Sequence, residues 1–350
     1  MDDRDEPPAQ RRPRTPETRA ARPQSPRTDL RMLFPLYQPA QEIGDRWLTR
    51  AYAGPSPQEG RDALAHHFLK QTHELEPDPG RKRDFADAAN LLDWERHDEL
   101  LVLGHRYRVV RIERYVRFTK DEPDRPRPTD PAPAPSSPAP GESERSARQH
   151  DIDLTSDAET DADSTALKAE LRELVPAGGP IPREVTEDAL VRHMAYPDVV
   201  VLPPGFQLLM RLGGERAWRP FGSDCTTPDE AREDLRQHLA HRSRSDGEWN
   251  ADTTTDERTA YGEALAEVEA KGLVDAVSVR NRHYRVARVI RIARVGFDGP
   301  ETPRESDHDP YPPPAAQHLE AHEQGLLDED DEGPPDPPGE EAKKFLLGPG

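Results

Sequence analysis

The amino-acid sequence predicts an α+β fold that contains two tandem copies of one ββ-αα-ββ module with antiparallel sheets. Two observations indicate it: a segment that recurs along the chain, and strand-like alternation followed by helical periodicity in each recurrence. The third observation is composition, since the 350 residues are only 33% hydrophobic and include 39 prolines. Ordinary soluble domains are roughly 45–50% apolar. We therefore expect folded modules flanked by disordered arms and joined by a Pro-rich linker.

The recurring segment defines the two copies. An offset of 171 residues carries Trp47 onto Trp218 and aligns the helix that follows each of them. Further on, an offset of 177 lays Tyr107–Ile112 over Tyr284–Val289. The difference of six residues indicates an insertion between the two helices of the second copy. A module of this size has a modest core by itself, so we expect the copies to pack as a pseudo-symmetric pair. Copy one spans residues 32–118 and copy two spans 199–297.

Each copy begins with a strand hairpin and a helix. Apolar residues alternate along 206–212, as in a strand with one buried face, and Gly213-Gly214 gives a turn before 217–221. A helix follows, because both copies carry a capping sequence with proline at the first helical position. These sequences are Ser56-Pro57-Gln58-Glu59 and Thr227-Pro228-Asp229-Glu230.

A second helix and a second hairpin complete each copy. Apolar residues at i, i+3, i+4 and i+7 indicate the helix, and a short strand, a tight turn and a long strand rich in Val, Ile and Tyr follow it. The turns are predicted at Gly104-His105 and Asn281-Arg282. The apolar helix positions are Phe85, Ala88, Ala89 and Leu92, matched by Tyr261, Ala264, Leu265 and Val268.

The rest of the chain is rich in proline and charge. Segments of this composition are typical of disorder or extended linkers, although Ala166–Val175 and Glu184–Met194 have helical patterns. We predict a disordered Arg/Pro arm at 1–31, a Pro-rich and acidic linker at 119–165, a helical connector at 166–198, and a disordered acidic, Pro-rich tail at 298–350.

Of the formal net charge of −20, −19 lies outside the two copies. Copy one has 13 basic and 14 acidic residues, and copy two has 15 of each. Within each copy the helices are acidic and the last strand is basic, so residues 276–295 hold six arginines and no acid. The run Asp328–Glu332 is expected to shield these arginines weakly, as surface ion pairs do.

The Arg-rich last strand of each copy is the candidate binding site. Alternation along a strand puts Arg108 and Arg114 on one face and Arg111 and Arg117 on the other. Three alternatives stay open: the arginines pair with the acidic helices and cover core edges, they bind nucleic acid or another polyanion, or they bind an acidic protein partner. The candidate residues are Tyr107, Arg108, Arg111, Arg114, Arg117, Tyr284, Arg285, Arg288, Arg291 and Arg294.

No motif predicts catalysis, a cofactor or a metal. The sequence contains no G-x-S-x-G, H-E-x-x-H or Walker-type pattern. His238 and His241 share a helix face and Cys225 lies upstream, but three groups are too few for a zinc site, so we expect solvated helix histidines. Trp47 and Trp218 are interpreted as core anchors. An enzyme with an unrecognised site in a groove between the copies remains the least favoured class.

Cysteine usage and hydropathy predict the compartment. The single Cys225 permits no disulfide within the chain, which is typical of a reducing cytoplasm. The first 31 residues contain no apolar core of a secretory signal, and no apolar run approaches the roughly 18 residues that span a bilayer. We therefore expect a cytoplasmic protein with no membrane partner.

The repeated block also resembles a known family. The run Gly104–Arg114 followed by Pro126-Arg127-Pro128-Thr129-Asp130 is similar to an actinobacterial family of unknown function, as is Tyr284–Arg294 followed by Pro303-Arg304-Glu305-Ser306-Asp307. The resemblance covers most of 32–310. It implies a cytoplasmic location and no established activity, and it supplies no catalytic residues.

The sequence thus favours a non-enzymatic, cytoplasmic binding or regulatory module that engages a protein partner. The alternative is a protein that binds nucleic acid or another polyanion through the Arg-rich strand of each copy. Neither function requires a cofactor.

Overall fold

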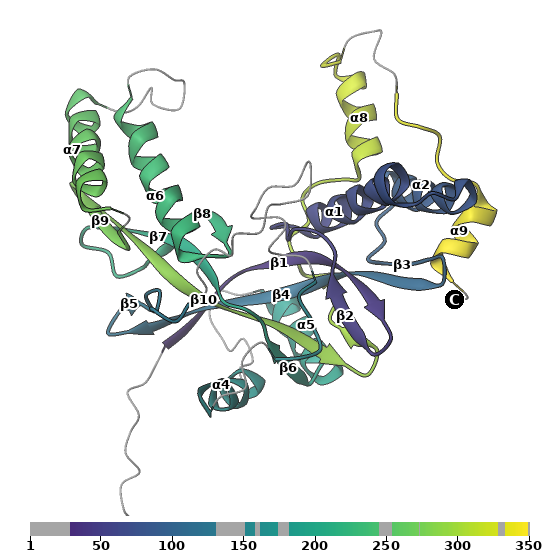
Figure 1. The fold of residues 1–350 in the computed structure, drawn as a ribbon, viewed down its shortest axis with the longest axis horizontal. Coiled ribbons are helices and arrows are strands. Elements are labelled where there is room, and N and C mark those ends of the chain that lie inside the picture. The colour runs from purple at the N-terminus through teal and green to yellow at the C-terminus, as the bar shows by residue number, and fades with distance from the viewer. Residues whose placement is uncertain are drawn as a thin grey trace, which may run out of the picture.

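The protein has an α+β fold with an antiparallel sheet, as the sequence predicts (Figure 1). It is seen here in a computed structural model. Residues 1–28 of the predicted N-terminal arm lie outside the described residues, and so does the run Asp328–Glu332. The structure describes residues 29–130, 151–157, 162–173, 182–244, 254–272, 274–327 and 333–348.

The sheet is organised around two long strands, β4 and β10. Its hydrogen-bonded path runs β2-β1-β4-β10-β7-β8, and the other strands of the described chain pair with β4 or β10. We call the part from β1 to β5 the first half and the part from β6 to β11 the second half. The strands are β1 (Asp29–Ile43), β2 (Arg46–Thr49), β3 (Glu99–Val102), β4 (His105–Thr119), β5 (Glu122–Pro123), β6 (Asp198–Val201), β7 (Gly205–Leu212), β8 (Arg219–Cys225), β9 (Ala276–Val279), β10 (Arg282–Gly296) and β11 (Gly299–Pro300).

The two long strands join the halves into one sheet. β4 and β10 pair antiparallel, with Arg114 opposite Arg291 and Glu113 opposite Ile292. The offset of 177 residues relates Arg114 to Arg291, so the register places two corresponding residues directly opposite each other.

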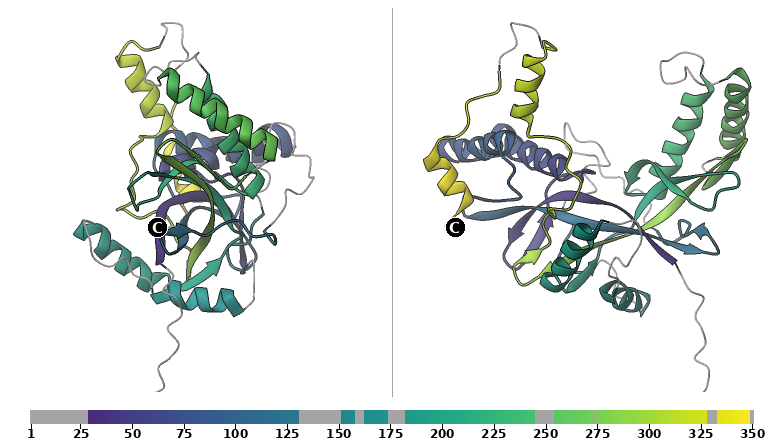
Figure 2. Two further views of the ribbon diagram at one scale, coloured as in Figure 1. Left: turned by 90° about the vertical axis from the view of Figure 1, so that its left-hand side faces the viewer. Right: turned by 180° about the vertical axis from the view of Figure 1, so that it is seen from behind.

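Helical hairpins cover one side of the sheet at its two ends. The pair α1/α2 lies over the first half and the pair α6/α7 over the second, while α4 and α5 lie on the other side (Figures 1 and 2). The helices are α1 (Pro57–Lys70), α2 (Pro79–Trp94), α4 (Ala162–Glu173), α5 (Arg183–Ala195), α6 (Pro228–Ser243), α7 (Thr255–Lys271), α8 (Pro314–Glu323) and α9 (Glu340–Leu347), and the π-helical turn η1 (Gln71–Leu75) follows α1.

The predicted helix starts are confirmed. The Ser56 hydroxyl accepts a hydrogen bond from the Glu59 amide at 3.2 Å, and the Thr227 hydroxyl accepts one from the Glu230 amide at 3.3 Å. Such caps satisfy amides that the first helical turn leaves without a partner. The insertion that the sequence predicts between the helices of copy two falls at 245–253, outside the described residues.

The two β-hairpin turns lie one residue earlier than predicted. Val102 pairs with His105, and Val279 pairs with Arg282. The turn residues are therefore 103–104 and 280–281. Leu103 and Arg280 both have positive φ, at 54° and 53°, because two-residue hairpin turns need this conformation to match the strand twist.

Each helical hairpin packs on its own half of the sheet. Under α1/α2, Phe68 and Phe85 pack with Tyr107 of β4. Under α6/α7, Leu235 and Tyr261 belong to one buried cluster with Tyr284 of β10 and Phe206 of β7. The apolar positions predicted for the helices thus form two separate cores.

The segment after β10 differs from the predicted disordered tail. Residues 298–327 and 333–348 have defined structure, with β11 paired to β10 and with helices α8 and α9. Carboxylates hold this segment in place: Asp307 pairs with Arg111, and Asp309 pairs with Arg61 of α1 at 2.7 Å. The acidic composition was therefore a sign of ion pairing with the sheet, not only of solvation.

Part of the predicted linker is also packed. Leu154 is fully buried in a cluster with Trp47, and its amide donates to the Trp47 carbonyl at 2.8 Å. The connector forms two helices, α4 and α5, close to the predicted positions.

Candidate functional site

The pairing of β4 with β10 places Arg114 opposite Arg291 in the middle of the sheet, whereas Arg108 and Arg285 lie toward its two ends. Most of the candidate arginines are buried rather than solvent-facing. The residues exposed by 5% or less are Tyr107, Arg108, Arg111, Arg114, Tyr284, Arg291 and Arg294. The other side chains are exposed by 30% at Arg117, 15% at Arg285 and 11% at Arg288.

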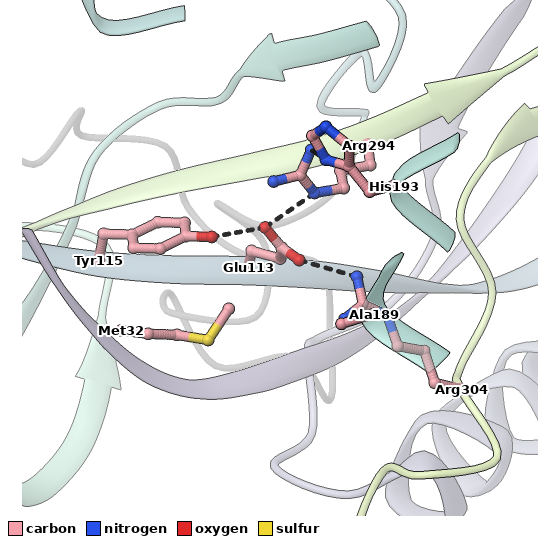
Figure 3. A pocket seen from close by; sticks show the side chains of 7 residues that line it. All are labelled: Met32, Glu113, Tyr115, Ala189, His193, Arg294 and Arg304. Atoms are coloured by element: carbon pink, nitrogen blue, oxygen red, sulfur yellow. Dashed lines mark hydrogen bonds and ion pairs between the residues drawn. The ribbon is translucent and has the colours of Figure 1, made fainter. Parts of the chain in front are cut away.

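A cluster of buried ion pairs surrounds Glu113 of β4. Its carboxylate oxygens lie 2.8 Å from Arg111, 3.1 Å from Arg294 and 3.0 Å from Arg304. The Tyr115 hydroxyl donates to the same carboxylate at 2.7 Å, as Figure 3 shows. β4, β10 and the segment after β11 thus meet at one side chain.

Two further carboxylates balance the charge of this cluster. Arg304 pairs with Glu301 at 2.7 Å, and Arg111 pairs with Asp307 at 3.1 Å. The cluster has no net charge, because it consists of three arginines and three carboxylates. These are Arg111, Arg294 and Arg304 with Glu113, Glu301 and Asp307. A buried charge that is paired and hydrogen-bonded is tolerated, whereas an unpaired one is costly.

The electrostatics of the cluster favour a fixed protonation state. Burial raises the pKa of Glu113, but Arg111, Arg294 and Arg304 outweigh it and lower this pKa to about 2. Burial, and next the Glu113 carboxylate, raise the pKa of Tyr115 above its ordinary value. At neutral pH the carboxyl is ionised and the phenol is protonated. Neither is suited to proton exchange near pH 7, which general acid–base catalysis requires.

A small cavity adjoins the Glu113 cluster. Its volume of about 10 Å³ is the space that one water molecule needs. His193 of α5 lies at its edge, with Nδ1 3.2 Å from Nη1 of Arg294. The cavity is too small for a substrate. Its lining is Met32, Glu113, Tyr115, Ala189, His193, Arg294 and Arg304.

The two halves exchange acidic residues. Asp307, which follows β10, pairs with Arg111 of β4, and Asp130, which follows β4, pairs with Arg288 of β10 at 2.8 Å. The backbones are held in the same way, since the amide of Arg111 donates to Glu301 and that of Arg288 donates to Asp124. Each of the two aspartates also accepts a hydrogen bond from the backbone amide three residues before it. Asp130 accepts from Arg127 at 2.7 Å, and Asp307 accepts from Arg304 at 2.8 Å.

Two arginines share one acid at the centre of the sheet. Nη1 of Arg114 lies 3.1 Å from Asp224 of β8, and Nη1 of Arg291 lies 3.7 Å from the same carboxylate. Their Nε atoms donate to the carbonyls of Phe34 and Pro203. Burial, which outweighs Asp224, lowers the pKa of Arg291, and the charge of Arg114 adds to this effect.

Tryptophan rings cover two more of the arginines. The guanidinium carbon of Arg108 lies 4.8 Å from the centre of the Trp47 ring, and that of Arg285 lies 5.5 Å from Trp218. Arg108 also pairs with Asp298 at 2.7 Å. These are cation–π contacts in which the arginine stem and the ring bury one another.

One of the three alternatives from the sequence was that the arginines pair with the acidic helices. In the structure their partners lie mostly elsewhere. The carboxylates come mainly from strands and from the segments that follow β4 and β10. Sequence reasoning did not single out Glu113 or Glu301, and it named Arg304 only as part of the motif that resembles the family. The repeated Pro-Arg-x-x-Asp motif, which ends at Asp130 and at Asp307, was the signal that could have found the exchange.

The predicted histidines are not equally solvated. His238 is half-buried against the second core, where Nε2 is 3.2 Å from the Tyr284 hydroxyl, and that hydroxyl is 2.9 Å from the Tyr261 hydroxyl. Burial, assisted by Arg242, lowers the pKa of His238 to about 4. The imidazole is therefore neutral at pH 7.

Metal and membrane features are not found in the described part of the chain. No group of three or more His, Cys, Asp or Glu residues there could hold a metal ion. Cys225 is buried, with Sγ 3.4 Å from Asp234. None of the described helices is both long and apolar enough to cross a membrane.

Comparison with known proteins places this chain in a family without assigning an activity. No curated protein and no solved structure matches it. A family model described as a family of unknown function, DUF5954, matches residues 13–310. The match covers both Arg-rich strands and the segments that exchange acids, which agrees with the resemblance seen in the sequence. An actinobacterial origin stays a prediction. The chain belongs to DUF5954, a family of unknown function.

Proposed function

We propose that this chain is a non-enzymatic, cytoplasmic binding module that engages a protein partner through an exposed apolar surface. Two features of the molecule support this function. The Arg-rich strands are paired internally, so they form a structural core. A helix on the opposite side of the sheet from the helical hairpins carries solvent-exposed apolar residues.

We also infer that the two halves are copies of one ββ-αα-ββ module, packed about a pseudo-twofold axis near Arg114 and Arg291. Contacts at corresponding positions support this inference. Arg61 pairs with Asp98 in the first half at 2.8 Å, and Arg232 pairs with Asp275 in the second at 2.7 Å. The exchanged pairs Arg111–Asp307 and Arg288–Asp130 also differ by the offset of 177.

The internal pairing weakens the polyanion alternative. A polyanion must displace or add to the carboxylates that already neutralise the arginines. At the Glu113 cluster this would break ion pairs that are nearly excluded from water. Nucleic-acid binding usually depends on arginines and lysines that solvent and counterions can reach.

The apolar surface consists of Leu190, Val191 and Met194 of α5 together with Phe297, and we call it the α5 patch. The three helix residues lie on one face by their spacing and are exposed by 43%, 58% and 73%. Phe297 is fully exposed and follows Gly296, which packs so closely on Ala195 that a Cβ would lie 2.4 Å from its carbonyl oxygen. Clustered exposed apolar residues mark protein interaction sites more often than single ones do.

The observation that carries this function is the exposure of Val191 and Met194 on a helix whose Ala189 is buried and whose His193 contacts Arg294 of β10. The partner is therefore expected to present an apolar surface of its own, with polar groups at the rim facing Arg183 and Glu187 of the same helix.

A pull-down from native lysate tests the proposal. The baits are the wild-type chain, a Val191→Asp/Met194→Asp variant and a matched Leu69→Asp variant, because Leu69 is an exposed apolar residue of α1 (40%) outside the patch. Each bait is used with and without nuclease. We expect a stoichiometric protein that wild type and Leu69→Asp retain and that the double variant loses, with unchanged melting temperatures.

The opposite result would favour the polyanion alternative. Material that nuclease removes and that Val191→Asp/Met194→Asp still retains would contradict the α5 patch and the protein-partner function together.

A further inference from the structure

The C-terminal helix α9 lies on the helical hairpin of the first half, outside the segment that matches the family. That match ends at residue 310, whereas α9 begins at Glu340. Figure 1 shows α9 beside α2 and β3. Leu346 of α9 is 2% exposed and belongs to the same buried cluster as Leu91, Leu92 and Leu100. This chain therefore supplies part of a core from its own C-terminal extension.

Polar contacts fix the direction in which the extension runs. Trp94 at the end of α2 donates to the Pro335 carbonyl at 2.8 Å, and Asn90 donates to the Asp336 carbonyl at 2.7 Å. Lys343 of α9 pairs with Glu95 at 2.6 Å. These contacts are specific, but the ion pair lies at the surface and such pairs are weak.

The extension does not fill the surface it occupies. A cavity of about 220 Å³ remains between α2 and α9, lined by Asp84, Asp87, Ala342, Phe345 and Leu346. The Phe345 side chain is still 61% exposed. Two carboxylates thus face an open apolar space, which would accommodate a longer cationic side chain better than it does Ala342.

The described part of the second half does not have this surface. The helix spacing of the repeat relates Leu91 of α2 to Glu267 of α7. Leu91 is fully buried in the cluster that contains Leu346, whereas Glu267 is 58% exposed and pairs with Lys271. An apolar helix could not pack there in the same way, so the surface is a feature of the first half.

We propose that the α2/β3 face is a docking site for a basic amphipathic helix of a partner protein, and that α9 occupies it as an intramolecular competitor. The seated α9 shows the chemistry that the face accepts: an aliphatic residue in the core cluster and a lysine on Glu95. The acidic lining at Asp84 and Asp87 adds a preference for a second cation. Helix-in-groove recognition of this kind uses anchors at i, i+3 and i+4. Ala342, Phe345 and Leu346 of α9 have this spacing, but only Leu346 is buried, so the other two positions are open to a better-fitting helix.

The competition has a quantitative consequence. A segment tethered by a short linker acts at an effective concentration of about 1 mM, so a partner helix must bind more tightly than α9 or arrive when α9 has been released. The docking site lies on α2 and β3, and its occupancy does not depend on the α5 patch.

The test measures binding of a fluorescent peptide of residues 333–348 to the full-length chain by anisotropy. The wild-type chain is compared with Leu346→Asp, which should release α9, and with Leu326→Asp, a control at an exposed residue (72%) of the same extension. We expect Leu346→Asp to bind the peptide at least tenfold more tightly than wild type and Leu326→Asp do. Equal affinity for all three chains, or no binding to Leu346→Asp, would overturn the proposal.

One further chain variant makes the test independent of core damage, and two peptide variants test the charge preference. Lys343→Glu breaks only surface ion pairs, the one with Glu95 and a longer one with Glu340 of α9 itself. It should therefore increase peptide binding about threefold, even if Leu346→Asp melts early. The charge preference is tested with two peptides of residues 333–348, one carrying Ala342→Lys and one carrying Ala342→Glu. Both are added to the Leu346→Asp chain, or to the Lys343→Glu chain if Leu346→Asp is unstable. The Ala342→Lys peptide should bind more tightly. No gain with Lys343→Glu would count against the intramolecular competitor. Equal binding of the two peptides would exclude the preference for a basic helix.

Discussion

The carboxylate of Glu113 is expected to be the most costly single charge to remove from this protein. It is 2% exposed and contacts Arg111, Arg294 and Arg304 at once. In Glu113→Gln the side chain keeps its shape, but three buried arginines are left with two carboxylates. Removing one partner of a buried ion pair typically costs about 3–5 kcal/mol.

The pKa of Glu113 gives a similar magnitude. Its lowering from 4.5 to about 2 corresponds to about 3 kcal/mol of stability at neutral pH. For a chain of this size such a loss lowers the melting temperature by about 5 °C. We expect this decrease for Glu113→Gln at pH 7. The matched control is Glu170→Gln, because Glu170 is 39% exposed and lies 4.0 Å from Arg117, and it should change stability by at most about 1 kcal/mol.

The pH dependence gives the effect a definite sign. The pKa of Glu113 is depressed in the folded state, so its contribution is present above the unfolded value of 4.5 and is lost as pH falls toward about 2. Denaturant unfolding of wild type and Glu113→Gln should therefore differ most at pH 7 and converge below pH 4.5. A variant that is as stable as wild type at pH 7, or a difference that persists at pH 2, would refute the reasoning.

Three further perturbations have expected outcomes. Asp307→Asn and Asp130→Asn should each destabilise by about 3 kcal/mol in denaturant unfolding, and their effects should add because the two pairs lie far apart along β4 and β10; a loss at only one site would contradict the exchange of acids. Wild type should lose stability as pH falls from 6.5 to 4, because the lowered pKa of His238 keeps the folded imidazole neutral while the unfolded one becomes protonated. His238→Gln should not show this loss. A variant with the same pH profile as wild type would count against the burial of His238. Trp47→Ala should cost about 3–5 kcal/mol and more than Trp218→Ala, because Trp47 is only 3% exposed; equal losses in melting temperature would show that the two rings are equally buried.

The order of strands and helices within each half could be predicted because local signals were strong. Alternation, helix periodicity and the capping residues Ser56 and Thr227 each act within a few residues. The pairing of β4 with β10 was not predicted, since register depends on contacts between residues 177 apart in sequence. The internal offset led only to the general expectation that the two recurring segments pack together.

The acidic partners of the arginines were harder to predict. Asp307 lies 196 residues from Arg111, and composition alone interprets an acidic, proline-containing segment as solvated chain. The segment is ordered because its carboxylates meet buried guanidinium groups, a long-range effect that local propensity does not contain. The burial of Arg294 was missed for the same reason, since a strand with arginine on both faces is usually exposed unless acids from elsewhere cover it.

The central claim is that the arginines of β4 and β10 hold the fold together rather than bind a polyanion. Arg111→Gln tests it most directly, with the melting temperature measured beside the affinity for a labelled single-stranded polynucleotide at low and high salt. The guanidinium of Arg111 is buried between Glu113 and Asp307. We predict a melting temperature lowered by about 5 °C and an unchanged polynucleotide affinity at both salt concentrations. An unchanged melting temperature, with loss of a salt-dependent affinity that wild type shows, would contradict the claim.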